Sequence, residues 1–399
     1  MLFGMTIPTF RLTILALAVL AQLYLFFRVR RVIRSSQRSE RFKARATRLV
    51  GAAIGLLFVV NTGILFKPLP WPDLPAAANI GLIYPAAVWG LGSIFSAVLL
   101  FVMQVAGGLG RMVVRLISGL AGRTAPAPMD PGRRRFLRAG VGGLAAAPFL
   151  LSGYGAAYAG KSYEVQELNL PFGRRVRVVQ LTDIHCGIYM SREEMRRYAE
   201  QVNALQPDLF VLTGDYISNS IRFLPPCLEE MARVSARYGR FATLGNHEHW
   251  YGQLDELQAI FDRHGIPLLQ NSHQVIQTPE GPFAVAGIDD LRSGNPDLPA
   301  ALRGIAPGIS TILLSHRPEI FPRAAAAGIA LTLSGHYHGG QIKLSLPGGD
   351  ISLAHLRTPY PEGLYRIDAS HLYVSRGIGT TFTPVRLNAP PEVTLLHLR

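Results

Sequence analysis

The stretch LTLSGHYHGGQ, residues 331–341, joins a short apolar run to two histidines that stand one residue apart. The run 331–333 is typical of a strand that is buried on both faces. His336 and His338 follow this run, with glycines on both sides. Side chains at positions i and i+2 of an extended chain point to the same side, so both rings can serve one site. The glycines let the backbone turn and leave room for a ligand.

The same arrangement occurs four more times upstream in the chain. Each instance is a β-rich run that ends in polar residues, namely VRVVQLTDIH (176–185), PDLFVLTGDY (207–216), RFATLGNHEHW (240–250) and STILLSHRPE (310–319). Helical segments lie between some of these runs, such as 191–205, whose Ser191 and Glu194 have the spacing of a capping box. Strand ends that gather at one edge of a layered α/β domain are where ligands bind.

The polar residues at these strand ends are carboxylates, imidazoles and one amide. They are Asp183, His185, Asp215, Asn246, His316, His336 and His338. Nitrogen and oxygen donors in this mixture suit divalent Mn, Fe or Zn better than Mg or Ca. The pairs Asp183/His185 and His336/His338 are therefore expected to hold two ions, which Asp215 could bridge with both of its oxygens.

Taken together, DIH, GD, GNHE, SH and GHYH resemble, in order and spacing, the motifs of the calcineurin-like metallophosphoesterases. Any one of these motifs is weak, whereas five in order, each after an apolar run, are specific. The resemblance covers residues 170–399 and implies an α/β fold, a four-layer α/β/β/α sandwich. It also implies hydrolysis of a phosphate ester with two bound metal ions.

The resemblance assigns a role to each matching position. The implied ligands are Asp183, His185 and His338 for one cation and Asn246, His316 and His336 for the other, with Asp215 bridging. A hydroxide held between the cations would attack phosphorus. His247 would act as the catalytic residue that approaches the leaving oxygen without binding metal. No ligand position departs from the family pattern, and Tyr337 between the two histidines is a tolerated variation.

Several residues beside these strand ends are open to two interpretations. Asp289 and Asp290 end another apolar run, and an ordinary strand-to-turn end is favoured over a contact with a ligand histidine. Glu248 is expected to orient either the neighbouring histidine or a loop. Arg317 follows a candidate ligand, and a surface ion pair is favoured over a contact with phosphate. The segment 341–363 is rich in Gly and Pro, and it is either a long β-hairpin or a wall of the substrate pocket.

The excess of positive charge is confined to the first part of the chain. Residues 1–159 hold 18 Lys and Arg against 3 Asp and Glu, a net +15, whereas residues 160–399 hold 22 against 23. A nucleic-acid-binding protein is expected to carry its basic patch on the folded domain, so no nucleic-acid partner is predicted. The two cysteines, Cys186 and Cys227, make no disulfide framework and are expected to be buried or free thiols.

The first part also holds three long runs without a charged residue, 12–27, 49–66 and 80–106. They predict transmembrane helices, because roughly 20 apolar residues cross a bilayer. Basic residues gather on either side of the connection 67–79, which itself holds only Lys67. Positive loops stay in the cytoplasm, so this connection is expected to face outward.

A fourth apolar stretch, GRRRFLRAGVGGLAAAPFLLSGYGAAYAG (132–160), resembles a twin-arginine export signal. Arg133 and Arg134 precede a mild apolar run, and AYA (157–159) has the small-x-small form of a cleavage site. An ordinary fourth span is the alternative, and either interpretation places the following residues outside. Retention as an anchor is favoured over cleavage after Ala159.

We therefore expect two parts: a membrane region, 1–159, with three transmembrane helices plus the fourth apolar signal or anchor segment (132–159), and a calcineurin-like phosphoesterase domain, 160–399. This combination resembles the bacterial membrane-anchored branch of the family. The expected substrate is a phosphate ester, diester or pyrophosphate; a lipid-linked phosphate is compatible with the membrane spans, although anchoring by itself does not establish it.

The expected location is the cell (inner) membrane, with several spans and the catalytic domain facing the periplasm or outside. The expected partners are the lipid bilayer, the phosphorylated substrate and, if 132–159 acts as a signal, the twin-arginine translocase. The alternative function is a non-catalytic metal-binding sensor or accessory membrane protein on the same fold. That alternative gives His247 no role.

Overall fold

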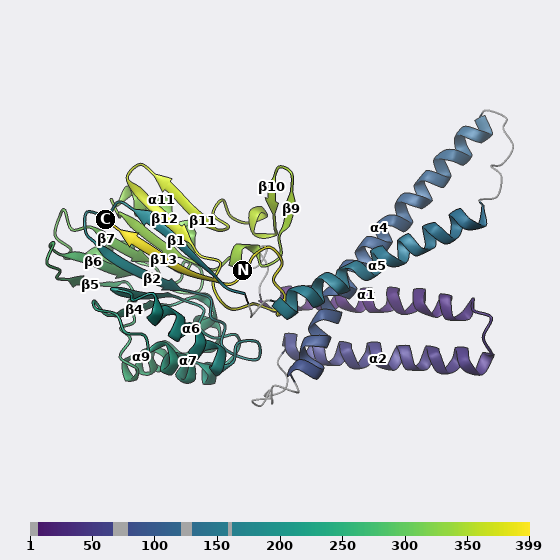
Figure 1. Cartoon of the computed structure of the whole chain (residues 1–399), viewed down its shortest axis with the longest axis horizontal. Helices are drawn as coiled ribbons and strands as arrows, with labels where there is room; N and C mark the ends of the chain where they lie inside the picture. Colours follow the sequence, from purple (N-terminus) through teal and green to yellow (C-terminus); the bar gives the residue numbers. More distant parts are fainter. Residues whose placement is uncertain (1–6, 67–78, 121–129, 159–161) are drawn as a thin grey trace. The chain divides into compact units, whose positions relative to one another are not determined.

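The computed structural model describes residues 7–66, 79–120, 130–158 and 162–399. The chain forms two compact units, Met1–Ala156 and Ala157–Arg399. The first is drawn in purple to blue in Figure 1 and contains only helices among its described residues. The second contains all of the described strands.

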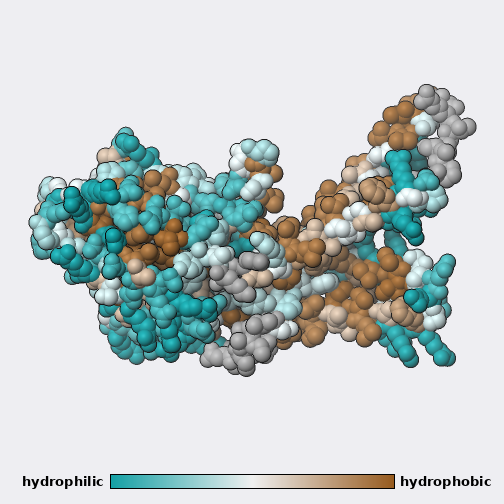
Figure 2. Space-filling model, in the orientation of Figure 1, coloured by the Kyte–Doolittle hydropathy of each residue, from teal (hydrophilic) through white to brown (hydrophobic). Residues whose placement is uncertain are grey.

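The first unit is built from α1 (Ile7–Arg34), α2 (Glu40–Phe66), the π-helical turn η1 (Asn79–Ile83), α4 (Tyr84–Leu120) and α5 (Pro131–Tyr158). The four α-helices are all long and apolar enough to cross a membrane, and Figure 2 shows apolar surface along them. The expectation of all-α membrane-length helices before the sandwich is therefore confirmed, and the fourth apolar segment is itself a helix of 28 residues. Residues 67–78 of the predicted outward connection and Ala159 of the predicted cleavage site lie outside the described residues.

The helices of the first unit are joined by polar as well as apolar contacts. Gln22 of α1 donates from Nε2 to Ser93 Oγ of α4 at 2.7 Å, and its Oε1 accepts from Trp89 Nε1 at 2.8 Å. Ser96 of α4 donates to the carbonyl of Ala145 in α5 at 2.9 Å. Within a bilayer, interhelical hydrogen bonds of this kind stabilise helix association by about 0.6–2 kcal/mol.

The second unit contains two mixed sheets. The order of strands in the first sheet is β1 (Glu164–Leu170), β13 (Glu392–Leu398), β2 (Val176–Leu181), β3 (Leu209–Thr213) and β4 (Arg240–Thr243). The order in the second sheet is β11 (Gly363–Ile367), β12 (Ser370–Val374), β8 (Leu331–Ser334), β7 (Thr311–Leu314), β6 (Phe283–Gly287) and β5 (Ser272–Ile276). Two short strands, β9 (Leu344–Leu346) and β10 (Gly349–Ile351), form a separate hairpin.

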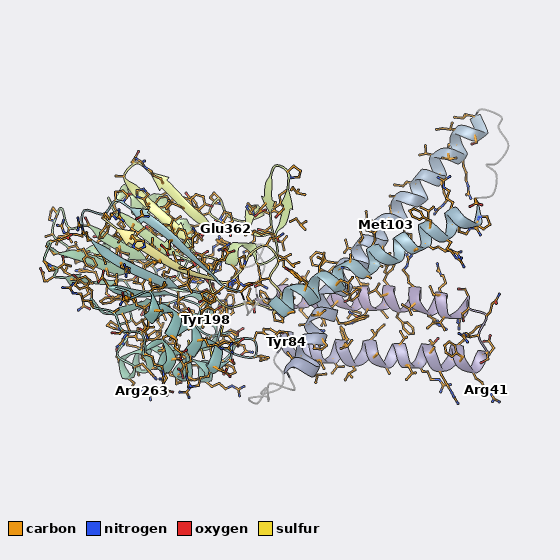
Figure 3. The ribbon with its side chains drawn as sticks, in the orientation of Figure 1. Arg41, Tyr84, Met103, Tyr198, Arg263 and Glu362 are labelled. Carbon is orange, nitrogen blue, oxygen red and sulfur yellow. The ribbon has the colours of Figure 1, made fainter. Side chains whose placement is uncertain are left out.

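Helices cover the outer face of each sheet. The helices α6 (Arg192–Ala204), α7 (Leu224–Met231) and α9 (Leu254–Arg263) pack on the first sheet, while α10 (Leu298–Leu302) and α11 (Phe321–Ala326) pack on the second. Tyr198 of α6, labelled in Figure 3, is buried in the first of these layers. A core that includes Val178, Val285 and Leu333 fills the space between the sheets. The predicted four-layer α/β/β/α sandwich is therefore confirmed.

The remaining described elements are single turns: α8 (Asn246–Tyr251), η2 (Ile221–Phe223), η3 (Pro318–Ile320), η4 (His338–Gly340) and η5 (Ala354–Leu356). The predicted capping box is present at the start of α6. The Ser191 hydroxyl accepts the backbone N–H of Glu194, and the Glu194 carboxylate accepts the backbone N–H of Ser191. Cys186 and Cys227 are buried free thiols, as expected.

The direction of the central strands is what positions the site. In the first sheet β2, β3 and β4 run parallel, and in the second β6, β7 and β8 run parallel. Their near-continuous apolar sequences suit strands covered on both faces. Parallel strands deliver their carboxyl ends to one edge of a sheet, so the polar residues that follow each strand are brought together.

Candidate metal centre

The five sequence-predicted strand ends meet at one place in the second unit. Asp183 and His185 follow β2, Asp215 follows β3, and Asn246 and His247 follow β4 in the first sheet. His316 follows β7, and His336 and His338 follow β8 in the second sheet. All eight side chains are buried except that of His336, which is half-buried.

The first group of side chains comes from β2 and β8. The Nε2 atoms of His185 and His338 lie 3.1 Å apart. Asp183 Oδ1 lies 3.2 Å from His338 Nε2 and 3.9 Å from His185 Nε2. One carboxylate oxygen and two ring nitrogens therefore point at a common centre, and the three ligand atoms are close enough to hold one metal ion.

The second group joins β3 to β7 and β8. His316 Nε2 lies 3.3 Å from Asp215 Oδ2 and 3.1 Å from Nδ1 of His336. These three residues also form a set that could hold a metal ion. The other ring nitrogen of His316, Nδ1, lies 2.8 Å from the carbonyl oxygen of Thr213. A proton on Nδ1 satisfies that carbonyl and leaves Nε2 free as a ligand atom, which is the usual arrangement behind a metal-binding histidine.

Asp215 lies between the two groups. Its Oδ1 accepts the backbone N–H of His247 at 2.9 Å. Its Oδ2 lies 3.7 Å from His185 Nε2 in the first group and 3.3 Å from His316 Nε2 in the second. A single oxygen of Asp215 therefore faces histidines of both groups, while the other oxygen fixes the turn after β4.

Asn246 lies beside Arg317, which was expected on the surface and not in the site. Arg317 is 3 % exposed, so the expected surface ion pair is wrong. Its Nε donates to Asp290 Oδ2 at 2.8 Å, its Nη2 donates to Asn246 Oδ1 at 3.0 Å, and its Nη1 contacts His336 Nε2. The buried carboxylate of Asp290 neutralises the guanidinium and so allows it to lie inside the domain.

The backbone of the centre is in an uncommon conformation. Positive φ values occur at Asp183 (51°), His185 (48°), Asp215 (55°), His336 (76°) and His338 (52°). Left-handed conformations are rare in non-glycine residues, although Asp and His adopt them more often than most. Such conformations persist only where the surrounding structure over-determines them, and they cluster at functional sites.

Two glycines are required by close approach rather than by φ. A Cβ on Gly335 would lie 2.2 Å from Asp183 Oδ2, and a Cβ on Gly245 would lie 2.3 Å from Asp215 Oδ1. The glycine before His336 therefore admits the carboxylate of the neighbouring sheet, in addition to the turn that the sequence suggested. Gly335 lets a loop of the second sheet approach a loop of the first, and Gly245 lets the turns after β3 and β4 of the first sheet approach each other.

Burial and neighbouring charges set the protonation of these groups. Burial alone would raise the pKa of Asp183, but the His338 ring beside it outweighs burial and lowers the value to about 2. Burial, helped by neighbouring positive charges, lowers the pKa of His185 and of His336 well below the ordinary value. Ionised carboxylates and neutral imidazoles are the forms that bind metal ions. His316 differs, because Asp215 outweighs burial and raises its pKa to about 10, so this ring would release a proton on binding a cation.

The residues present are suited to hold metal ions. Asp183 Oδ1 and His185 Nδ1 are buried and make no hydrogen bond within the described part of the chain. Buried polar atoms without a partner are costly and rare in folded proteins. A cation close to Asp183 Oδ1 would satisfy that oxygen and would separate the two ring nitrogens that face each other 3.1 Å apart.

His247 stands at the margin of the centre. Its Nδ1 lies 2.8 Å from the carbonyl of Ser218, and its Nε2 lies 3.9 Å from Asp215 Oδ2. The ring packs against His185, with centroids 4.5 Å apart, and against Trp250, with centroids 4.8 Å apart. The bond to Ser218 holds a proton on Nδ1, so Nε2 is the nitrogen presented to the centre.

Glu248 orients loops rather than a histidine. Its two oxygens accept backbone N–H groups of Asp215, Tyr216 and Gly245 at 2.8–2.9 Å. Burial, followed by the nearby Asp215 carboxylate, raises the pKa of Glu248 to about 7, against the opposing effect of the amide bonds. This side chain therefore joins the turn after β3 to the turn after β4.

The pair Asp289–Asp290 forms the strand-to-turn end that the sequence favoured, and the histidine that it contacts is not a predicted ligand. Asp290 caps the turn after β6 through the backbone N–H of Ser293 at 2.7 Å and also holds Arg317. Asp289 Oδ1 lies 2.6 Å from His249 Nε2, which is not one of the predicted ligands.

Arg386 is a neighbour of the centre that sequence reasoning missed. It is 4 % exposed, and its Nη2 lies 3.3 Å from His338 Nδ1. The same guanidinium donates to the carbonyls of Arg376, Gly377 and Ala389. It thus fixes the loop that covers His338. No motif surrounds it, and the only signal in the sequence is one arginine in an otherwise uncharged segment, 377–391.

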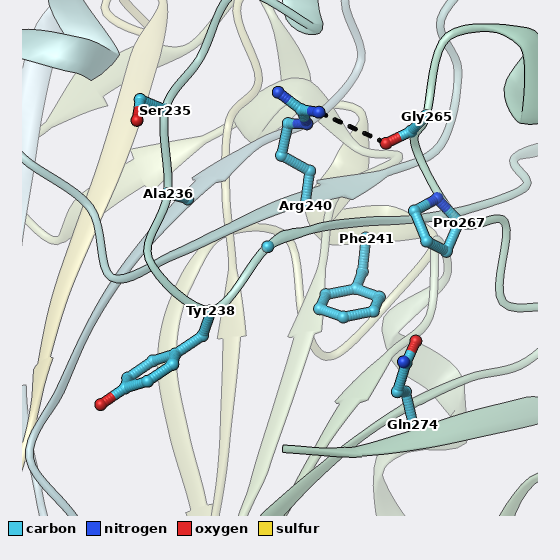
Figure 4. A pocket seen from close by; sticks show the side chains of 9 residues that line it. Ser235, Ala236, Tyr238, Arg240, Phe241, Gly265, Pro267 and Gln274 are labelled. Atoms are coloured by element: carbon cyan, nitrogen blue, oxygen red, sulfur yellow. Dashed lines mark hydrogen bonds between the residues drawn. The ribbon is translucent and has the colours of Figure 1, made fainter. Parts of the chain in front are cut away.

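A cavity of about 410 Å³ lies at the other end of the strands (Figure 4). It is lined by residues at the start of β4 and in the loops beside it, and Arg240 there donates to the carbonyl of Gly265 at 3.4 Å. None of the predicted site residues lines it. This cavity is therefore separate from the metal centre.

Comparison with known proteins agrees with this geometry. The family model of the calcineurin-like phosphoesterases matches residues 176–340, which include all eight predicted site residues. The chain is 31 % identical over 280 residues to the uncharacterized metallophosphoesterase YkuE of Bacillus subtilis, an alignment that covers 67 % of this chain and 97 % of that protein. The chain belongs to the calcineurin-like metallophosphoesterase family.

Other metallophosphoesterases similar to this chain are membrane proteins by name. The transmembrane protein with metallophosphoesterase domain of Danio rerio is 30 % identical, with 63 % of this chain and 60 % of that protein covered. The protein of the same name from Bos taurus is 29 % identical, with 71 % and 67 % covered. The chain thus spans about 60 % of the length of the fish relative. The name of both relatives combines a transmembrane protein with a metallophosphoesterase domain.

Proposed function

We propose that this chain is a membrane-anchored phosphoesterase that depends on two divalent cations. Its substrate class is a phosphate ester, diester or pyrophosphate, and its catalytic domain faces the extracytoplasmic side. The single observation that supports the proposal most is the position of Asp215 Oδ2, between His185 of one three-residue group and His316 of the other. Two cation sites that share a carboxylate are the arrangement used for in-line displacement at phosphorus.

Each group would hold one cation. Asp183, His185 and His338 would bind the first, His316 and His336 with Asn246 the second, and Asp215 would contact both. When bound, Mn, Fe or Zn ions would lower the pKa of a water molecule and neutralise charge on the phosphoryl oxygens. Arg317, which contacts both Asn246 and His336, orients the second group.

His247 would act on the leaving group. Its Nδ1 is engaged by the carbonyl of Ser218, so only Nε2 can exchange a proton with a substrate. Asp215 Oδ2 lies 3.9 Å from this Nε2 atom. His247 would then donate the Nε2 proton to the departing oxygen, a step worth about 10²–10⁴ in rate.

The membrane part supports the proposed orientation and substrate class. Basic residues are concentrated in 28–48 and 107–138, at the helix ends away from the connection 67–79, and they favour a cytoplasmic position for those ends. Residues 132–159 would serve as a twin-arginine-like signal or as a retained anchor, with the translocase as a partner in the first case. A catalytic domain held at a bilayer favours a phosphate carried by a lipid.

The proposal is tested on the full chain in nanodiscs. The purified protein is expected to bind two equivalents of Mn or Zn and to hydrolyse bis(p-nitrophenyl) phosphate or p-nitrophenyl phosphate. Chelation should abolish turnover, and readdition of the metal should restore it. A folded sample that takes up fewer than two ions when they are supplied in excess, or that binds two and hydrolyses neither compound, would contradict the proposal.

Topology needs a separate test. Periplasm-dependent reporter fusions after Asp73 and Val165 are expected to be active, and a fusion after Glu40 is expected to be inactive. A fusion after Val165 that is active only with a cytoplasm-dependent reporter would overturn the extracytoplasmic assignment.

A further inference from the structure

The segment 344–356, which we call the apolar hairpin, is the most exposed apolar part of the second unit. Nine large apolar side chains of its described residues are exposed, and five of them lie in this segment: Leu344, Leu346, Ile351, Leu353 and Leu356, at 49–76 % exposure. Exposed apolar groups that are scattered singly need no explanation, but a cluster indicates a surface that binds something. Figure 2 shows apolar surface on this projecting hairpin.

The hairpin is amphipathic. Leu344 pairs with Ile351 across the two strands, and Leu346 lies on the same face by the alternation of a strand. Ser345 pairs with Asp350 on the opposite face, where the serine hydroxyl donates to the carboxylate at 2.8 Å. Leu344, Leu346 and Ile351 therefore lie on one face of the two strands, and Ser345 and Asp350 lie on the other.

The polar face carries no unbalanced charge. Lys343 binds Asp350 at 3.3 Å and Glu362, labelled in Figure 3, at 2.6 Å. Asp350 and Lys343 are the only residues with a full charge between 341 and 356. Insertion of the hairpin tip into an apolar medium would therefore leave no isolated charge to desolvate.

The hairpin is continuous with the metal centre. It follows the turn η4, which contains His338, and its last turn, η5, packs under that turn. Ser352 lies so close to Gly340 that a Cβ there would approach its hydroxyl to 2.1 Å. Whatever medium covers the hairpin thus lies next to the loop that carries two candidate ligands.

We infer that the apolar hairpin inserts into the boundary between headgroups and acyl chains of the bilayer that holds the four helices. Only five residues, 159–163, separate the end of α5 from the start of β1, so the connection reaches roughly 20 Å at most. A lipid surface is therefore always within reach of the domain. Amphipathic elements with an aliphatic face and balanced polar groups are suited to this boundary.

A second copy of the chain is a poorer match for this surface. Five partly exposed aliphatic side chains offer on the order of a few hundred Å², whereas a stable dimer buries roughly 800 Å² per partner. Insertion does not depend on the proposed function. Its consequence, that phosphate in a lipid headgroup is drawn toward the metal centre, rests on the proposed function.

Insertion is tested by fluorescence on the full chain in nanodiscs. Leu346→Cys is labelled with an environment-sensitive dye, and Leu254→Cys, an exposed leucine of α9, is the matched control. The native thiols are buried and should not label. Phospholipids with a nitroxide on the acyl chain should quench the dye at position 346 and not the dye at 254. Equal absence of quenching at both positions would overturn the inference, as would a blue shift that depends only on protein concentration.

The consequence for substrate is tested with the double variant Leu344→Asp/Leu346→Asp. We expect hydrolysis of phosphate in a vesicle lipid headgroup to fall at least about tenfold, while turnover of a soluble diester is unchanged. Leu254→Asp should change neither rate. Loss of quenching without any loss of lipid hydrolysis would refute the substrate role of the hairpin. Failure of the wild-type chain on every phosphate would refute the proposed function and leave the quenching result standing.

Discussion

Two clusters of buried carboxylates in the second unit differ in how their charge is balanced. Glu230 of α7 is fully buried and is bound by three arginines, with Arg192 Nε at 2.6 Å, Arg233 Nε at 2.9 Å and Arg196 Nη2 at 3.1 Å. In the metal centre, Asp183 and Asp215 instead face imidazoles, two of which have pKa values lowered well below the ordinary one. The chain itself neutralises the first cluster. It neutralises the second only in part: against the effect of burial, Asp215 raises the pKa of His316 to about 10, and the rings of His185 and His336 stay neutral.

The backbone shows the same contrast. Glu230 and its arginines lie on or beside regular helices, whereas five of the seven candidate metal ligands have positive φ. Each such conformation costs of order 1 kcal/mol or more. The Glu230 carboxylate thus has ion-pair partners and lies in regular helix. The candidate site instead contains buried polar atoms without a hydrogen bond and residues with strained backbone conformations. In this chain, the difference distinguishes the candidate site from the Glu230 cluster.

The largest expected effect comes from Asp215→Asn. The amide keeps an oxygen for the His247 N–H but removes the charge that both cation sites share. We expect turnover to fall by more than about 10⁴, because neither cation is then held in place. Metal content by mass spectrometry should drop below two per chain. Glu230→Gln is the matched control, a buried carboxylate converted to an amide, and it should retain both metals and full turnover. If Asp215→Asn and Glu230→Gln lost metal and turnover equally, the two carboxylates would not differ in function.

A smaller effect is expected from His247→Gln. The side chain belongs to the centre but is not a predicted ligand, so both metals should remain bound. Turnover should fall by about 10²–10⁴, the contribution of a general acid. His249→Gln is the control, because that ring is engaged by Asp289 instead. A His247→Gln protein that keeps its metals and its full cellular function would favour a metal-binding sensor over an enzyme.

The sequence was sufficient for the parts of the site that follow strands. A buried strand is visible as an apolar run, and the carboxyl ends of parallel strands meet, so the eight site residues could be grouped before any coordinates were known. The two sheets and their helical cover were predictable for the same reason, together with the resemblance to a known family. Three of the four membrane-length helices were visible as uncharged runs, and the fourth was visible as the apolar stretch that resembles an export signal.

The sequence was insufficient for residues whose partners lie elsewhere in the chain. Arg317 was expected on the surface because nothing near it in sequence neutralises it, and Asp290, its partner, stands 27 positions earlier. Arg386 is 48 positions from His338 and has no motif of its own. The amides held by Glu248 belong mainly to another strand end. Tertiary pairing of this kind leaves no local pattern.

The smallest expected effect is on stability and again involves Glu230. The hydrogen bond from Arg196, aided by that from Arg192 and opposed by burial, lowers the pKa of Glu230 from 4.5 to about 2. We expect Glu230→Gln to lower the free energy of unfolding at pH 7 by about 1 kcal/mol, because the arginines are half-exposed and water screens them. The thermal midpoint of the metal-free full chain, with chelator present throughout, measures this loss.

The pH dependence of that loss follows from the sign of the shift. A carboxyl whose pKa is lower in the folded chain contributes its full stability above pH 4.5, and the contribution disappears as the pH falls from 4.5 to about 2. The difference between wild type and Glu230→Gln should therefore shrink across this window. Glu193→Gln is the control, since its exposed pair with Arg197 at 3.5 Å should contribute little at any pH. A difference that stays constant down to pH 2 would show that packing, not charge, holds Glu230, and the contrast between the two carboxylate clusters would then have to rest on backbone strain alone.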